Sequence, residues 1–158
     1  MSFQLIRGHI ESRVNDAFQA MVPPLEVVWD NVQETPPALP YVICSISYTD
    51  TTIPVVCQEQ SMVEDIRGNL QLAIYAPRAR GMSALEVYAT EAMKIMNQMY
   101  DQNALVHVRC GAISGPVPLL AGDQPYAMVN VSCPFVARVL GRSPDVLVKM
   151  YTDEVSVP

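Results

Sequence analysis

Nucleophilic catalysis would need a serine or cysteine with a base beside it, and the sequence offers few such arrangements. Residues 111–115 (Gly-Ala-Ile-Ser-Gly) faintly resemble a nucleophile elbow, but Ser114 stands one position away from where that motif needs it. We therefore interpret Ser114 as a loop serine. His107 and Cys110 lie three positions apart, and on a strand this spacing points the two side chains to opposite faces. The glycine-rich phosphate-binding motifs do not occur in the sequence.

Four cysteines are the next candidates, and they are far apart: Cys44, Cys57, Cys110 and Cys133. A zinc site usually has two ligands within a few residues of each other, and no Cys-x-x-Cys pair is present. Three of the four stand in apolar, strand-like runs. We interpret them as buried structural thiols, and we expect neither a metal nor a cofactor.

The acidic pairs Glu64-Asp65 and Asp153-Glu154 could suggest general acid–base chemistry. Adjacent carboxylates on an extended chain point in different directions, so we interpret both pairs as solvated acids. The sequence therefore predicts a protein that is not an enzyme.

Length and composition limit the classes of protein to which the chain can belong. The 158 residues fit about one domain, half of them are hydrophobic, and 16% are charged, which indicates a folded chain with a real core. No apolar run is long enough to span a membrane, and the first ten residues lack a signal-peptide pattern, so we expect a cytoplasmic site of synthesis. The net charge of −6 argues against general affinity for DNA or acidic membranes.

A strand followed by a long helix is the clearest pattern in the chain. Residues 67–75 alternate apolar and polar side chains, and Gly68 indicates a bulge or a close backbone approach. Ser83 and Glu86 have the spacing of a capping box, which predicts that the helix begins at Ser83. One apolar stripe follows at helical spacing and should pack on the apolar face of the strand. The stripe consists of Leu85, Tyr88, Ala92, Ile95, Met96 and Met99.

The N-terminal half predicts one more helix and three strands. Residues 3–21 have helical periodicity, and residues 25–32 and 41–48 read as strands. Residues 49–52 (Thr-Asp-Thr-Thr) predict a polar turn, and residues 53–58 the returning arm of a hairpin.

The C-terminal half predicts two strands separated by a loop. Residues 105–110 and 126–140 read as strands, and residues 111–123, with three glycines and two prolines, as a loop. Pro134 should break the second strand or place it on a sheet edge. We expect an α+β fold, a mostly antiparallel twisted sheet with two helices packed on one face, in a domain of residues 1–140 with a C-terminal extension of residues 141–158.

Four segments, taken together in chain order, form a further pattern. They are an opening helix (6–18), a Trp-Asp-Asn-Val segment followed by prolines and a strand (25–41), a glycine-led strand that ends in Ala-Pro (68–77), and a helix with two closing strands (81–99 and beyond). Over roughly residues 3–139, the chain resembles the tail terminator (tail completion) proteins of long-tailed bacteriophages. The motifs are packing and turn signatures, and none is catalytic.

The resemblance implies a structural virion protein without cofactors. Such proteins form a homohexameric ring that caps the tail tube, stops its polymerisation and joins the tail to the head-side connector or stopper protein. The implied partners are other copies of the chain, the tail tube protein and that connector; DNA only passes through the lumen, and no membrane is involved. The resemblance places the protein in the virion tail or neck, assembled in the host cytoplasm.

Residues 49–65, between the predicted strands 41–48 and 67–75, lack a clear secondary-structure pattern over most of their length. Loops held by a rigid sheet often carry binding residues. Because the resemblance implies that hairpin loops approach the tube, we predict a tube contact at Glu59, Glu64 and Asp65. Two alternatives stay open: another neck or tail ring component on the same fold, or a small ligand-binding or enzymatic domain with a site at the 111–123 loop.

Contacts between subunits are predicted at two further places. Arg78 and Arg80 flank a turn, and exposed guanidinium groups bind carboxylates in bidentate geometry. Val146, Val148 and Met150 make the C-terminal extension too apolar for a plain solvent linker, so we expect it to dock on a neighbouring subunit or partner.

Overall fold

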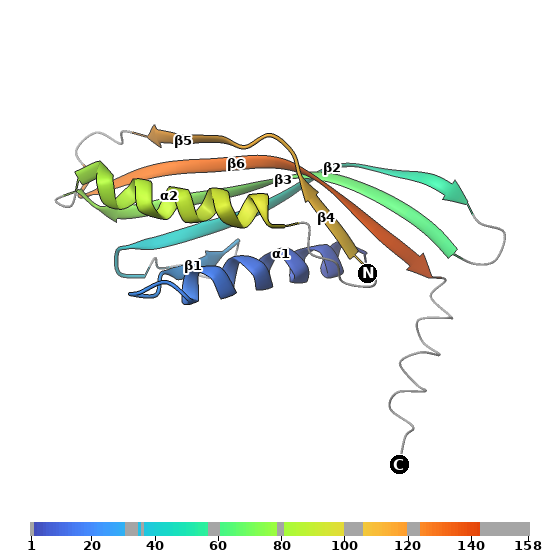
Figure 1. Ribbon diagram of the computed structural model, residues 1–158, viewed down its shortest axis with the longest axis horizontal. Helices are drawn as coiled ribbons and strands as arrows, with labels where there is room; N and C mark the ends of the chain where they lie inside the picture. Colours follow the sequence, from blue (N-terminus) through green and yellow to red (C-terminus); the bar gives the residue numbers. More distant parts are fainter. Residues whose placement is uncertain are drawn as a thin grey trace, which may run out of the picture.

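The computed structural model describes residues 2–30, 35, 37–56, 61–78, 81–99, 106–119 and 124–142. Within these residues the chain forms two helices and a six-stranded sheet, which confirms the predicted α+β fold (Figure 1). The elements follow in the order α1 (Ser2–Gln19), β1 (Glu26–Trp29), β2 (Tyr41–Val56), β3 (Ser61–Pro77), α2 (Gly81–Asn97), β4 (Val106–Cys110), β5 (Ser114–Leu119) and β6 (Tyr126–Arg142).

The sheet is built around three long strands, β2, β3 and β6, which pair antiparallel in that order. β1 pairs with β2 and is the one parallel neighbour among the described strands. β4 and β5 both pair with β6 on the side that β3 leaves free, β4 along residues 135–139 and β5 along residues 128–132. The sheet is therefore mostly antiparallel, as the sequence predicts.

Both helices bury their apolar stripes in one core against one face of the sheet. Leu70, Leu72 and Ile74 alternate along β3 and are fully buried in the same cluster as the helices. This confirms the predicted packing of the 85–99 stripe. The helical residues of this cluster are Ile6, Ile10, Val14 and Phe18 of α1 and Leu85, Ala89, Ala92, Ile95 and Met96 of α2. Neither described helix has the length and apolar content needed to cross a membrane.

The start of α2 differs from the prediction. The helix begins at Gly81, whose φ of 70° is in the left-handed region that favours glycine. Ser83 consequently lies inside the first turn and does not precede it, so the predicted capping box is misplaced by two residues.

The predicted turn at residues 49–52 is wrong. These residues continue β2 without a reversal, with Thr51 opposite Ile66 and Thr52 opposite Asp65 of β3. Residues 53–56 extend the same strand and do not return along it. Threonine favours extended backbone as strongly as the apolar strand formers do, so a polar run of this composition is compatible with a strand. Within the segment without a clear pattern, residues 49–56 and 61–65 are thus the paired ends of two long strands, β2 and β3.

Part of this hairpin projects past the helices. Figure 1 shows the far ends of β2, β3 and β6 extending together beyond α1 and α2. We call residues 51–56, 61–65 and 138–142 the arm. Thr51, Thr52 and Ile53 of the arm are exposed, Ile53 to 48%. Val139, at the base of the arm, is still buried in the core, and the far end of this three-stranded extension lies beyond the helical layer.

Two predictions about the C-terminal strands are also wrong. Residues 114–119 of the expected loop form β5, and β6 continues through Pro134 as far as Arg142, two residues past the predicted domain boundary. The carbonyl of Pro134 accepts a hydrogen bond from the backbone N–H of Gly111 at 2.7 Å, on the side of β6 away from β3. In an antiparallel pair joined in this way, the second bond would run from the N–H of residue 134 to the carbonyl of Gly111. Pro134 therefore removes one bond on the side of β4, which ends at Cys110, and its pairing with Asn69 of β3 is kept.

Candidate interaction surface

The sheet face opposite the helices, here called the outer face, carries most of the charged side chains of β3, β4 and β6. Side chains alternate along each strand, so the residues between the buried ones point outward. Arg67 on β3, Arg109 on β4 and Arg138 on β6 are all exposed in this way. The structure therefore brings three arginines that are far apart in the sequence to one end of the outer face.

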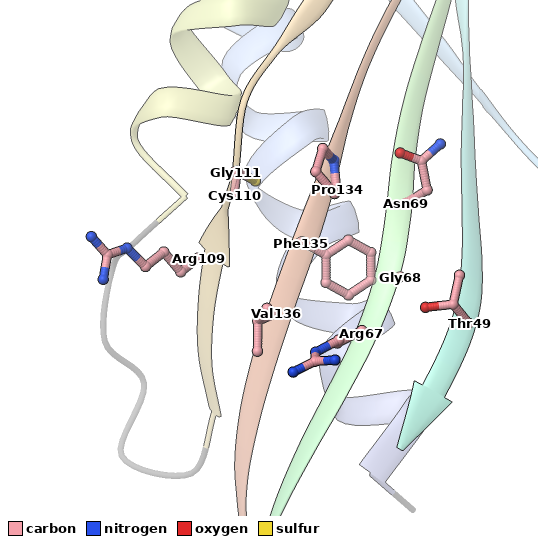
Figure 2. A pocket seen from close by; sticks show the side chains of 10 residues that line it. All are labelled: Thr49, Arg67, Gly68, Asn69, Arg109, Cys110, Gly111, Pro134, Phe135 and Val136. Atoms are coloured by element: carbon pink, nitrogen blue, oxygen red, sulfur yellow. The ribbon is translucent and has the colours of Figure 1, made fainter. Parts of the chain in front are cut away.

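A groove of about 410 Å³ lies on this face (Figure 2). Exposed Pro134 and Val136 contribute its apolar surface, and Arg67 and Arg109 stand at its rim. The full lining consists of Thr49, Arg67, Gly68, Asn69, Arg109, Cys110, Gly111, Pro134, Phe135 and Val136. A second hollow, of about 590 Å³, continues along the same face and is lined by Asp65, His107, Arg109, Val136 and Arg138.

Gly68 and Phe135 pair across β3 and β6 beneath the groove. A Cβ at position 68 would lie 2.5 Å from Cζ of Phe135 and would also meet the carbonyl oxygen of Ser47. The ring of Phe135 is buried on the helix side and covers the glycine, which confirms the close approach predicted for Gly68.

At the other end of the outer face, Tyr75 stacks on Tyr41 with ring centroids 4.9 Å apart, so large side chains fill the surface there.

The arginines of the outer face differ in their partners. The guanidinium of Arg138 donates two hydrogen bonds to the Asp65 carboxylate, at 2.7 and 2.8 Å, and these bonds lower the pKa of Asp65. Arg67 donates to Asp50 at 3.5 Å, a long contact between two exposed side chains. Arg109 makes no hydrogen bond or ion pair with any described residue, and Figure 2 shows it extending from β4 away from the other lining residues.

The residues predicted to contact the tube are distributed differently from the expectation. Glu64 and Asp65 are half-buried residues of β3, on opposite faces of the sheet, and do not belong to a loop. Asp65 is engaged with Arg138. Glu59 lies outside the described residues. The tube contact itself stays a prediction.

The residues predicted to contact other subunits fall at the far end of β3 and in the extension. Arg78 is exposed just after β3, and its backbone N–H donates to the carbonyl of Pro125 at 3.2 Å. Arg80 lies outside the described residues, as do Val146, Val148 and Met150. The structure thus separates Arg78 from the Asp65 region by nearly the whole length of β3.

The cysteines are free thiols where the structure describes them. Cys44 and Cys133 are buried and Cys110 is half-buried, in line with a structural role, and Cys57 lies outside the described residues. Burial raises the pKa of Cys44 to about 12. The thiols of Cys110 and Cys133 share a hydrogen bond, which raises the pKa of Cys110 together with burial. No local pattern indicates this contact, because it depends on the pairing of β4 with β6.

His107 and Ser114, the remaining candidates for chemistry, are both exposed on strands of the sheet. His107 is exposed on the outer face while Cys110 meets Cys133 on the opposite face, as the three-residue spacing predicts. Ser114 is the exposed first residue of β5, paired with Ser132. Across the residues that the structure describes, no cluster of three His, Cys, Asp or Glu side chains could hold a metal ion.

Comparison with known proteins adds a fold relationship. No protein-family model and no curated protein matches the chain. Seventeen chains of solved structures match, and one of these structures is similar over 90% of this chain and 99% of its own, with a TM-score of 0.68 and 25% sequence identity. Its name states no function, so the similarity bears on the fold.

Proposed function

We propose that this chain is a structural protein of a bacteriophage tail, a tail terminator that forms a ring on the end of the tail tube. The observation that carries the proposal is the arm, three paired strands that project past the helical layer (Figure 1). Ile53 of the arm is 48% exposed, and burial of such an apolar side chain against another chain would be favourable. Contact with a tube or a neighbouring subunit would cover it.

The edges of the sheet also favour assembly. β1 covers β2 only as far as Cys44, and the carboxylate of Asp30 accepts from the backbone N–H of Ile46 at 3.1 Å. Beyond Ile46, the outer edge of β2 has no strand partner among the described residues. Unpaired edge groups are a template for pairing with another chain. A closed ring needs two different patches that meet head to tail, and an open edge supplies one of them.

The resemblance to tail terminators supplies the partners: the tail tube protein, the head-side connector and other copies of the chain. In this proposal the arm binds the end of the tube. Its acidic side chains are carried on paired strands and not on a loop. A rigid contact recognises a formed surface with a smaller loss of conformational entropy than a disordered loop would need.

A small-ligand site is the second candidate, and one observation favours it. The groove on the outer face begins at Gly111, at the start of the 111–123 segment where such a site was predicted, and its volume is within the usual range for ligand pockets. The polar residues at its rim are exposed or half-buried, which suits a surface contact at least as well as an enclosed ligand.

Tube assembly in the presence of the protein tests the proposal. Tail tube protein polymerised with a substoichiometric amount of this chain should give short tubes of limited length, whereas tube protein alone should give long tubes. The matched control is the same chain with Glu64 and Asp65 replaced by lysine and its fold verified by circular dichroism. If tube lengths are the same with and without the parent protein, the terminator function is wrong.

A further inference from the structure

The groove on the outer face has no occupant within the described chain, and its chemistry fits one segment of the sequence. We propose that residues 143–158 of a second copy of this chain bind in the groove between Arg67 and Arg109. This inference rests on the proposed ring and specifies one of its head-to-tail contacts.

The groove offers an exposed apolar surface. Val136 is 42% exposed, and Pro134 and Gly111 beside it are exposed as well. Gly68 and Phe135, whose pairing joins β3 to β6, also line the groove, between the rim residues Arg67 and Arg109. Burial of such a surface is favourable in proportion to the apolar area removed from water. An extended segment with apolar side chains on alternate positions would therefore gain free energy by lying in the groove.

Residues 146–151 supply such a row. In an extended conformation, Val146, Val148 and Met150 would share one face, and Leu147, Lys149 and Tyr151 would share the other. Pro144, near the start of the segment, favours extended backbone in the residue before it. The apolar row can face Pro134 and Val136 while the alternate residues face solvent.

The charges are complementary as well. The segment has three acids, Asp145, Asp153 and Glu154, against one lysine, Lys149. On the receiving side, Asp50 and Asp65 neutralise Arg67 and Arg138, whereas the guanidinium of Arg109 has no partner among the described residues. A carboxylate of the segment would give Arg109 the partner that its own chain does not supply.

The direction of β6 favours a second copy over the same one. β6 passes the groove at residues 134–136 and continues to Arg142 in the arm, whose strands Figure 1 shows. Val136 lies six residues back along β6, about 20 Å at the rise of a strand. Residues 143–158 would have to reverse to reach their own groove, but they could enter the groove of a neighbour beyond the arm without turning. Such a contact joins two different patches, as a closed ring requires.

Photo-crosslinking in the full-length protein tests this contact. The photoreactive residue p-benzoylphenylalanine replaces Val136 in one preparation and Thr49, on the other side of the groove, in a second. Each is mixed with ¹⁵N-labelled parent protein under conditions that assemble the ring, irradiated, and analysed by mass spectrometry. We expect crosslinks from both positions to residues 143–158, joining labelled and unlabelled copies. The same residue in place of Val87, which is 58% exposed on α2, is the matched control and should give no such crosslinks.

Charge variants test the role of Arg109. Arg109→Glu should lower the yield of these crosslinks about fivefold, the loss expected for an exposed charge pair, and Arg109→Lys should preserve most of it. Crosslinks that map only to other segments, or that join only atoms of one copy, overturn the inference. Equal yields for Arg109→Glu and the parent overturn the assignment of Arg109.

The outcome is separable from that of the proposed function. If crosslinks between copies form but tube length does not change, the terminator function is wrong and this contact stands. If the tubes are capped and no crosslink reaches residues 143–158, the function stands and this contact is wrong.

Discussion

Replacement of Gly68 by alanine should destabilise the protein because the new methyl group has no room. Its position lies 2.5 Å from Cζ and 2.9 Å from Cε1 of Phe135. Carbon atoms pack at about 3.5–4.0 Å, so the ring would have to move by about 1 Å. The ring is buried and packs edge-on against Tyr48, with centroids 6.2 Å apart, and the carbonyl of Ser47 on β2 obstructs the methyl from the other side.

The magnitude follows from two opposing effects. One extra methyl group in a packed core costs about 1–3 kcal/mol, and two obstructed sides place Gly68→Ala near the upper limit. Loss of glycine freedom in the unfolded chain offsets about 0.4–1 kcal/mol of this. The free energy of unfolding should fall by about 2 kcal/mol, which lowers the melting temperature by about 4–8 °C in a protein of this size.

Urea unfolding followed by circular dichroism measures the change, with an unaltered slope as the sign that the two-state transition is preserved. Gly8→Ala is the matched control, because nothing lies within 4 Å of a Cβ at that exposed position of α1. It should raise stability by about 1 kcal/mol through helix propensity. A Gly68→Ala protein as stable as the parent would refute the packing of Phe135 over β3.

Three further predictions concern the core, the arm and the tube contact. Leu72→Ala should cost about 2–5 kcal/mol, since the side chain is fully buried between β3 and the helices, and a melting temperature within a degree or two of the parent would contradict this. The Arg138 guanidinium lowers the pKa of Asp65 below its ordinary value of 3.8, so the stability that this pair contributes is present above that pH and is lost as the pH falls through the lower, folded-state pKa. An NMR titration of Asp65 should show the lowered midpoint in the parent and its return toward 3.8 in Arg138→Gln; a parent midpoint at or above 3.8 would refute the pair. Reversal of the charges of Glu59, Glu64 and Asp65 together should abolish binding to purified tubes, and unchanged binding by the folded variant would exclude the arm from the contact.

The periodic elements of the fold were predictable because their side chains are sorted by burial. The stripe from Leu85 to Met99 and the alternation of Leu70, Leu72 and Ile74 each mark the side that meets the core, and the structure confirms both. The close contact at Gly68 was predictable for a different reason, because a glycine inside a strand indicates that another part of the chain approaches the backbone closely.

The arm and β5 were not predictable by that reasoning. Residues 49–52 are polar because the helices do not cover the sheet there, so the alternation that marks a half-buried strand is missing. β5 contains Pro116 and Pro118, which are typical of loops but tolerated on an edge strand, where a missing N–H faces solvent. Pro134 was misjudged because the end of β4 beside it, at Cys110, depends on pairings that no local pattern encodes.

The outer-face groove depends on long-range pairing as well. Arg67, Arg109 and Arg138 lie on three strands that only the order β3–β6–β4 brings together. The sequence indicates only that each arginine stands at an outward position of its own strand. A prediction of the strand order would have been needed to infer that the three arginines lie on one surface.

Electron microscopy of tail tubes incubated with the protein would show directly whether this chain caps them. We expect a sixfold ring of this chain on one end of each tube, with the three-stranded arm directed at the tube and none of the protein along its length. Tubes with bare ends, or with the protein bound along their sides, would contradict it.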